Sequence, residues 1–153
     1  MISSGIFIHP ATWFILGALL LPLARRFNAH KALLVAIPVI AFIQIYNLPE
    51  TFGVARYMGF EIIFGRVDKL TFVFLHVFTL MAIIGSIYSL HLDDIGEQTA
   101  SFLYVAGSLG VTLAGDYLTL FIFWELMAAS VFLIWSRRQG DPVRPVFAIF
   151  LCT

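Results

Sequence analysis

The chain has 153 residues, of which 61% are hydrophobic and 12% are charged, and its formal net charge is zero. A soluble domain carries about 25% charged residues, so the composition excludes an ordinary soluble domain, a disordered tail and a nucleic-acid-binding protein with a basic surface. The single cysteine, Cys152, excludes a disulfide framework and a multi-cysteine metal cluster. We therefore expect an integral membrane protein that contacts the lipid bilayer.

Five apolar runs approach the length of about 20 residues that a helix needs to cross a bilayer core. The predicted helices cover about residues 5–24, 32–48, 70–90, 99–114 and 117–135. A sixth apolar run, residues 146–153, is too short to cross and indicates the start of a sixth helix. The expected fold is an all-α membrane protein, with residues 1–153 forming a single membrane domain of five transmembrane helices and part of a sixth.

Residues 49–67 form neither an apolar run nor a plain loop. Gly53, Gly59 and Gly65 interrupt this segment, and the stretch Phe60–Phe64 has the composition of a strand. The pattern predicts a short hairpin or interfacial segment outside the membrane.

The positions of the basic residues predict the orientation of the chain. Six of the nine lie in the loops 25–31, 91–98 and 136–145, and such loops are cytoplasmic by the positive-inside rule. The segment before the first helix carries no basic residue, so no signal peptide is expected. We expect a multi-pass protein of the plasma membrane with its N-terminus outside.

Glu125 is the strongest functional candidate, because an ionisable side chain within a membrane helix is costly and usually functional. It follows Asp116 by nine residues, which places it about 14 Å along the fifth helix, near the bilayer midplane. Its helical neighbours are apolar, so a partner must come from another helix. Such a carboxyl group can exchange a proton or a cation; alternatively, it is a protonated hydrogen-bond donor between helices.

Three further ionisable residues lie in or near the predicted helices. His76, in the third helix, is a candidate proton relay because an imidazole titrates near neutral pH; alternatively, it packs between helices against a hydroxyl group. His9 and Asp116 lie near helix ends, where a helix cap or a solvated position competes with a role in translocation.

Other kinds of chemistry have no support in the sequence. There is no Gly-rich phosphate loop, no nucleophile triad and no spacing typical of metal ligands. We expect no cofactor, no metal and no catalytic site on this chain, although it is compatible with a subunit of an ion-translocating oxidoreductase complex.

The fifth predicted helix resembles a signature of antiporter-like membrane subunits. The resemblance lies in Gly115–Met127, which reads GDYLTLFIFWELM, and in two shorter motifs, Val67–Thr71 and Ile87–Ser89, at the two ends of the third helix. The family includes the D- and A-type subunits of Mrp cation/proton antiporters and the proton-pumping subunits of complex I and membrane-bound hydrogenases. Residues 60–138 carry the resemblance, and the first two helices fit only in pattern.

The resemblance implies a proton path in which Glu125 matches the family's fifth-helix glutamate. In the family, this glutamate pairs with a lysine on a broken seventh helix, and members have about fourteen helices. The present chain corresponds to the N-terminal portion only. The resemblance therefore implies other membrane subunits as partners, including a chain that supplies the missing helices and the lysine.

The leading interpretation is a membrane subunit of a multisubunit cation/proton antiporter, or of a hydrogenase-like or complex I-like assembly, that contributes to proton or sodium translocation. One alternative is a scaffold subunit without its own ion path. Another is a small self-contained exporter that dimerises around Glu125; a half-length last helix argues against it, because backbone groups would be exposed to lipid.

Overall fold

A computed structural model describes residues 8–27, 29–57, 60–91 and 94–139. Its helices are Pro10–Arg25 (α1), His30–Ile45 (α2), Lys69–Tyr88 (α3), Ile95–Leu113 (α4) and Tyr117–Gln139 (α5), with a short 3-10 turn at Ser89–His91. Two antiparallel strands, Thr51–Tyr57 (β1) and Phe60–Arg66 (β2), lie between α2 and α3. The described chain is therefore mostly helical, and the predicted start of a sixth helix at 146–153 lies outside the described residues.

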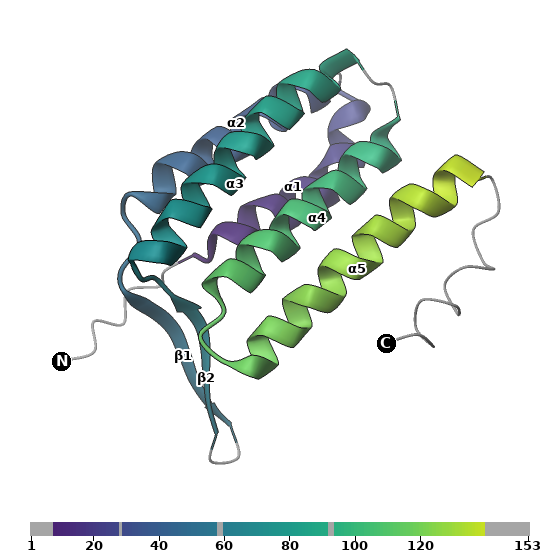
Figure 1. Ribbon diagram of the computed structural model, residues 1–153. Helices are drawn as coiled ribbons and strands as arrows, with labels where there is room; N and C mark the ends of the chain where they lie inside the picture. The colour runs from purple at the N-terminus through teal and green to yellow at the C-terminus, as the bar shows by residue number, and fades with distance from the viewer. Residues whose placement is uncertain (1–7, 28, 58–59, 92–93, 140–153) are drawn as a thin grey trace.

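The helices lie side by side in a bundle, and the hairpin projects from one end of it (Figure 1). Helix α4 packs against both α1 and α5, whereas α3 packs mainly against α2. The start of α1, the hairpin and the start of α5 are at the same end (Figure 1). The end of α1, the start of α2, the end of α3 and the start of α4 are at the opposite end (Figure 1).

Short polar side chains set where the helices begin. Asp68 accepts a hydrogen bond of 2.7 Å from the backbone N–H of Thr71 and starts α3. Asp94 accepts one of 2.8 Å from the N–H of Gly96 and starts α4. Such caps satisfy N–H groups that lack partners in a first helical turn. Because Asp94 is a cap, α4 begins at Ile95, four residues before the apolar run from which the sequence predicts a helix.

The hairpin is held to the bundle by its base. Thr51 pairs with Arg66 at the base and Tyr57 pairs with Phe60 at the tip. Phe52 is buried, and its ring lies over Gly65, where an added Cβ would be 2.1 Å from the ring. A larger residue than glycine at this position would displace the ring.

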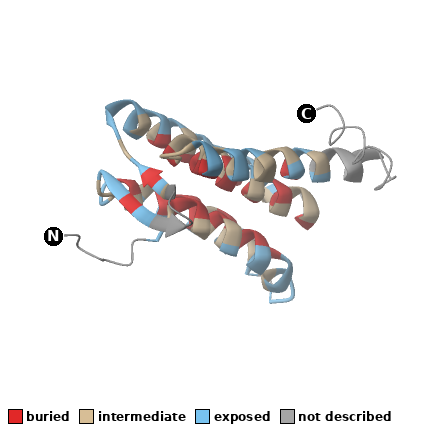
Figure 2. Ribbon diagram, turned by 90° about the horizontal axis from the view of Figure 1, so that it is seen from below, coloured by how far each residue is buried: buried red, intermediate tan, exposed pale blue. Residues whose placement is uncertain are grey.

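The buried residues lie on the stretches of helix that pass one another, and exposed residues lie mainly on the outward parts of the ribbon (Figure 2). Phe14, Leu34, Leu75 and Leu109, from four different helices, are among the fully buried residues. The outside is unusually apolar, because large hydrophobic side chains are exposed along α3 and α5. Such broad apolar surface is typical of a protein that contacts lipid or other subunits.

One described helix, Lys69–His91 including the 3-10 turn, is long and apolar enough to cross a membrane. Only 22% of its most apolar stretch is buried within the chain. The apolar helices Pro10–Arg25 and His30–Ile45 and the stretch Tyr117–Leu133 are shorter. That all five predicted helices cross a membrane stays a prediction.

Candidate functional site

Glu125 lies on the side of α5 that faces away from α4. The opposite side is defined by Phe123, whose ring lies beside Gly110 of α4, and by Met127, whose backbone lies beside Gly107. Successive residues of an α-helix are turned by about 100°, so Glu125 is turned by about 200° from Phe123. Within the described part of the chain, no hydrogen bond or ion pair reaches its side chain.

The surroundings of Glu125 on its own helix are apolar. One turn away lie Phe121, Ile122, Ala128 and Ala129, and the first two are more than half exposed. None of these side chains can donate a hydrogen bond or carry a positive charge. The half-buried carboxyl group therefore lies on an apolar surface that the described chain leaves uncovered.

Two glycines of α4 bring α5 close to the bundle. A Cβ at Gly110 would lie 2.1 Å from the ring of Phe123, and a Cβ at Gly107 would lie 3.0 Å from the backbone nitrogen of Met127. The Ser108 hydroxyl group donates to the sulfur of Met127 over 3.5 Å. Small residues let helices approach closely, so this contact fixes which side of α5 is left for Glu125.

Asp116 precedes α5 and joins it to the hairpin. Its Oδ1 accepts a hydrogen bond of 2.9 Å from the backbone N–H of Thr119, and its Oδ2 accepts bonds of 2.7 Å from the Thr119 hydroxyl and from the N–H of Ile63 in β2. Desolvation alone would raise the pKa of Asp116, but the hydrogen bonds from Thr119 and Ile63 outweigh it and hold the pKa below its usual value. The carboxylate is therefore ionised and fully engaged.

His9 connects the start of α1 with the hairpin and α5. Its Nδ1 accepts a hydrogen bond of 3.1 Å from the N–H of Ala11, which makes it the N-cap of α1. Its ring stacks on Phe123 at a centroid distance of 5.3 Å and an angle of 15°, and lies 5.5 Å from the ring of Phe52. The sequence indicates a cap as one alternative for His9, but it gives no sign of these ring contacts.

His76 lies on α3 among aromatic rings. Its Nδ1 is 2.8 Å from the carbonyl oxygen of Phe72. A carbonyl group only accepts, so Nδ1 carries a proton and Nε2 is the basic nitrogen of the neutral ring. The rings of Phe72, Tyr46 and Phe42 lie 4.3, 5.0 and 5.7 Å away. Among the described residues, no hydroxyl group forms a hydrogen bond with the ring of His76, and the nearby Thr79 hydroxyl donates to backbone carbonyls of its own helix.

The structure does not bring the three predicted translocation residues together. Asp116 immediately precedes α5, and Glu125 lies within α5, about 14 Å further along the helix axis. His76 is on α3, and α4 lies between α3 and α5 (Figure 1). Within the described residues, no hydrogen bond or ring contact joins any two of them. A path that uses both His76 and Glu125 needs additional groups.

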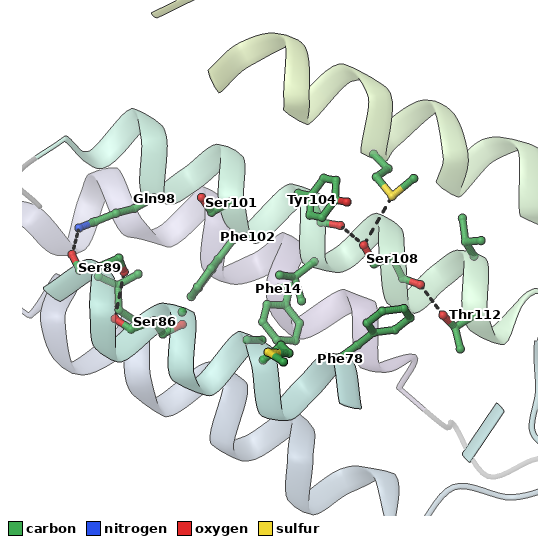
Figure 3. Close-up of a pocket in the computed structure, with 17 residues that line it drawn as sticks. Phe14, Phe78, Ser86, Ser89, Gln98, Ser101, Phe102, Tyr104, Ser108 and Thr112 are labelled. Carbon is green, nitrogen blue, oxygen red and sulfur yellow. Dashed lines mark hydrogen bonds between the residues drawn. The ribbon is translucent and has the colours of Figure 1, made fainter. Parts of the chain in front are cut away.

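A cavity of about 440 Å³ lies between α3 and α4 (Figure 3). Its walls are mostly apolar and include Phe14, Phe78 and Phe102, with Gln98 near one end and Thr112 near the other. The lining contains several hydroxyl groups but no charged side chain, and Glu125 is not part of it. No pattern in the sequence marks this cavity.

The described residues contain no group of three or more His, Cys, Asp or Glu side chains that could hold a metal ion. The ionisable side chains described above instead lie singly, on or next to apolar helices. In the part of the chain that the structure describes, the fold is mostly helical, one apolar helix has membrane length, and the acidic side chain of Glu125 lies on an apolar surface that no described residue covers.

Comparison with known proteins gives one informative similarity. The chain is 26% identical over 144 residues to the Na(+)/H(+) antiporter subunit A1 of Staphylococcus aureus, and the alignment covers 81% of this chain and 18% of that protein. The chain thus spans less than a fifth of the length of the curated relative that it matches. No family model and no solved structure matches. The similarity supports an antiporter-like family and a membrane protein.

Proposed function

We propose that this chain is a membrane subunit of a multisubunit cation/proton antiporter and that Glu125 takes part in proton or sodium translocation. The observation that carries the proposal is the position of Glu125, a carboxyl group on an uncovered apolar face of α5 with no partner among the described residues. The similarity to a Na(+)/H(+) antiporter subunit supports the same role. The Mrp type of assembly and a complex I-like or hydrogenase-like one are finer forms of this proposal.

The mechanism follows from the two charge states of Glu125. A positive charge nearby favours the carboxylate, and its withdrawal within apolar surroundings favours the protonated form. A lysine on another helix, supplied by a partner chain, would provide such a charge. Its movement toward and away from Glu125 would release and take up one proton per cycle.

Everted membrane vesicles that contain the assembled complex test this proposal. Sodium addition should dissipate a respiration-generated pH gradient in the native vesicles, as followed with a pH-sensitive acridine dye. We expect Glu125→Gln to abolish this response, because the amide cannot exchange a proton. The matched control is Glu50→Gln, at an exposed position before β1, which should respond normally. Normal antiport by an assembled Glu125→Gln complex would overturn the proposal.

His76 is proposed as a second proton carrier, because its Nδ1–H is held by the Phe72 carbonyl and its Nε2 is left as the basic nitrogen. His76→Asn tests this role, since asparagine can still donate to that carbonyl but has no titratable nitrogen. We expect slower antiport with an unchanged amount of complex. Antiport at the native rate would remove His76 from the path.

A scaffold subunit is the second candidate function, and the exposed apolar faces of α3 and α5 favour it. Such faces suit contacts with other membrane subunits as well as with lipid. The scaffold function predicts that deletion of this chain prevents assembly, while Glu125→Gln leaves both assembly and antiport intact. Native gel electrophoresis of the vesicles used above measures assembly, and the antiport response of the assembled Glu125→Gln complex distinguishes the two functions.

The proposed location is the plasma membrane, with the N-terminus and the hairpin outside. The structure supports a shared side for these two, because the start of α1 and the hairpin are at the same end of the bundle (Figure 1). In a Cys152→Ser background, Val54→Cys should react with an impermeant maleimide in intact cells, and Phe27→Cys should not. Both positions are more than half exposed. The reverse labelling would invert the orientation.

A further inference from the structure

The N-terminal half of α5 is held at two points before it reaches Glu125. At the first point, Gly115 and Asp116 bind the hairpin through Ile63. At the second, the ring of Phe123 stacks on His9. The two points are about two turns apart on α5. Together they can fix both the depth and the rotation of the helix that carries the carboxyl group.

The first point is more than a helix cap. One carboxylate oxygen of Asp116 caps α5, while the other accepts from the N–H of Ile63, which is 53 positions away in the sequence. The carbonyl oxygen of Ile63 accepts a bond of 3.0 Å from the N–H of Gly115. Both peptide groups of one hairpin residue are therefore bound to the turn before α5. This pair of bonds fixes the depth of α5, which is the position of its first residue along the bundle relative to the hairpin.

The same contact requires glycine at position 115. A Cβ there would lie 2.7 Å from the Cβ of Ile63 and 3.1 Å from its carbonyl oxygen. Alanine at this position would push the hairpin away from the turn without removing any charge. Gly115 thus offers a way to break the contact that is chemically independent of Asp116.

The second point controls rotation. Phe123 lies between the ring of His9 and Gly110 of α4, on the side of α5 opposite Glu125. If the ring of His9 were absent, Phe123 would keep Gly110 on one side but lose its stacking partner, which would weaken the hold on the rotation of α5. A turn of one residue position, about 100°, would move the carboxyl group to another face of the bundle.

We propose that Asp116 and His9 are positioning residues for Glu125, with Asp116 fixing the depth of α5 and His9 its rotation. This inference rests on the proposed function of Glu125. It assigns Asp116 a role as an anchor in place of a role as a proton carrier, and it explains why a hairpin outside the helices is bound to the helix that carries the carboxyl group.

The first experiment compares Asp116→Asn with Gly115→Ala in the vesicle assay. Positioning predicts that both variants slow antiport by about ten- to a hundredfold, the effect of a misplacement of about 1 Å. It also predicts that both shift the pH of half-maximal antiport in the same direction. A proton-carrying role for Asp116 predicts an effect of Asp116→Asn alone. Native rates for Gly115→Ala would overturn the proposal for Asp116.

The second experiment uses two variants of His9 that separate its two contacts. Asparagine keeps a side-chain cap for α1 but removes the ring, and phenylalanine keeps a ring against Phe123 but removes the cap. Rotation control predicts slower antiport for His9→Asn and a smaller effect for His9→Phe. Equal rates for His9→Asn and the native chain would show that the ring does not position α5.

A third measurement does not depend on ion flux. Glu125→Cys, in the Cys152→Ser background, reports the surroundings of position 125 through its rate of reaction with a membrane-permeant maleimide. We expect Asp116→Asn, Gly115→Ala and His9→Asn each to change this rate severalfold. If Glu125→Gln retains antiport but these labelling rates change, the proposed function fails and the positioning stands. Unchanged labelling rates would overturn the positioning itself.

Discussion

The two carboxyl groups at the start and in the middle of α5, Asp116 just before its first residue and Glu125 within it, have opposite environments. Asp116, at the start of the helix, accepts hydrogen bonds from Thr119 and from Ile63 of the hairpin. Glu125, nine residues later, receives none from the described part of the chain and lies on an apolar face. One group caps α5 and the other lies within it, and both are carboxyl groups, so the difference between them comes from what surrounds each one.

Asp116 is a structural carboxylate, whereas Glu125 is available to exchange a proton or a cation. Desolvation acts to raise the pKa of Asp116, and its hydrogen bonds, which stabilise the ionised form, lower that pKa further than desolvation raises it. An ionised, satisfied group is suited to hold two elements together. A group without a partner can bind and release a proton when a charge on another chain approaches. The contrast predicts that stability depends on Asp116 and that transport depends on Glu125.

The largest difference in stability is expected between the variants that remove the charge of Asp116 and the charge of Glu125. Asp116→Asn presents an amide where two carboxylate oxygens accept, which should lower the free energy of unfolding by about 2 kcal/mol, in the range for bonds to charged groups. Glu125→Gln should change it by less than about 0.5 kcal/mol, as for sites without specific contacts. Thermal unfolding in detergent, followed by circular dichroism, measures both. Equal losses would remove the distinction.

The contact that turns Glu125 away from α4 should be broken by alanine at Gly110. The new Cβ would lie 2.1 Å from the ring of Phe123, and overpacking of this kind costs about 1–3 kcal/mol. Gly85→Ala is the matched control in α3, because a Cβ there meets nothing within 4 Å. It should be neutral or stabilising by up to about 1 kcal/mol through helix propensity. Similar unfolding temperatures for the two variants would contradict the packing of α5 on α4.

Several features of the fold and site could be predicted from the sequence, because they depend on local composition. The apolar runs indicate a mostly helical chain, and the glycines of residues 49–67 suggest the hairpin. Glu125 is visible as the acidic residue within an apolar run. The start of α4 is less predictable, because the capping bond of Asp94 extends the helix beyond its apolar run.

The remaining features depend on contacts between distant residues. The bond from Ile63 to Asp116 joins positions 53 apart, and no local pattern marks it. The stacking of His9 on Phe123 joins the first helix to the last described one. From the sequence, Asp116 and His9 could be anticipated as helix caps, as solvated helix ends or as translocation residues, but their contacts with distant residues could not. The cavity between α3 and α4 is likewise a product of how these helices pack.

A helix cap whose printed hydrogen bond stays within its own helix should matter less than Asp116, which also accepts a bond from the hairpin. Asp68 is exposed and accepts from the N–H of Thr71 at the start of α3. Asp68→Ala should therefore lower the free energy of unfolding through the lost N-cap, and by less than Asp116→Asn does. Asp68→Asn keeps a capping oxygen and should recover most of this loss. If Asp68→Ala destabilised the chain as much as Asp116→Asn, the contact with the hairpin would contribute nothing.

Acid should weaken the contact between Asp116 and the hairpin, and it should lower stability by less than Asp116→Asn does. The pKa of Asp116 in the folded chain lies below its ordinary value of 3.8, so its carboxylate contributes stability above that pH and loses the contribution as the pH falls through the folded pKa. Thermal stability should thus be unaffected by Asp116 between pH 7 and pH 5 and should fall below about pH 4.

Asp68 has a lowered pKa as well, chiefly because of the N–H of Thr71, and titrates in the same range. The decline should therefore be shallower in Asp116→Asn than in the native chain, and the difference between the two isolates the contribution of Asp116. The protonated carboxyl group still accepts at one oxygen, which is why the effect of acid should be smaller than that of the substitution.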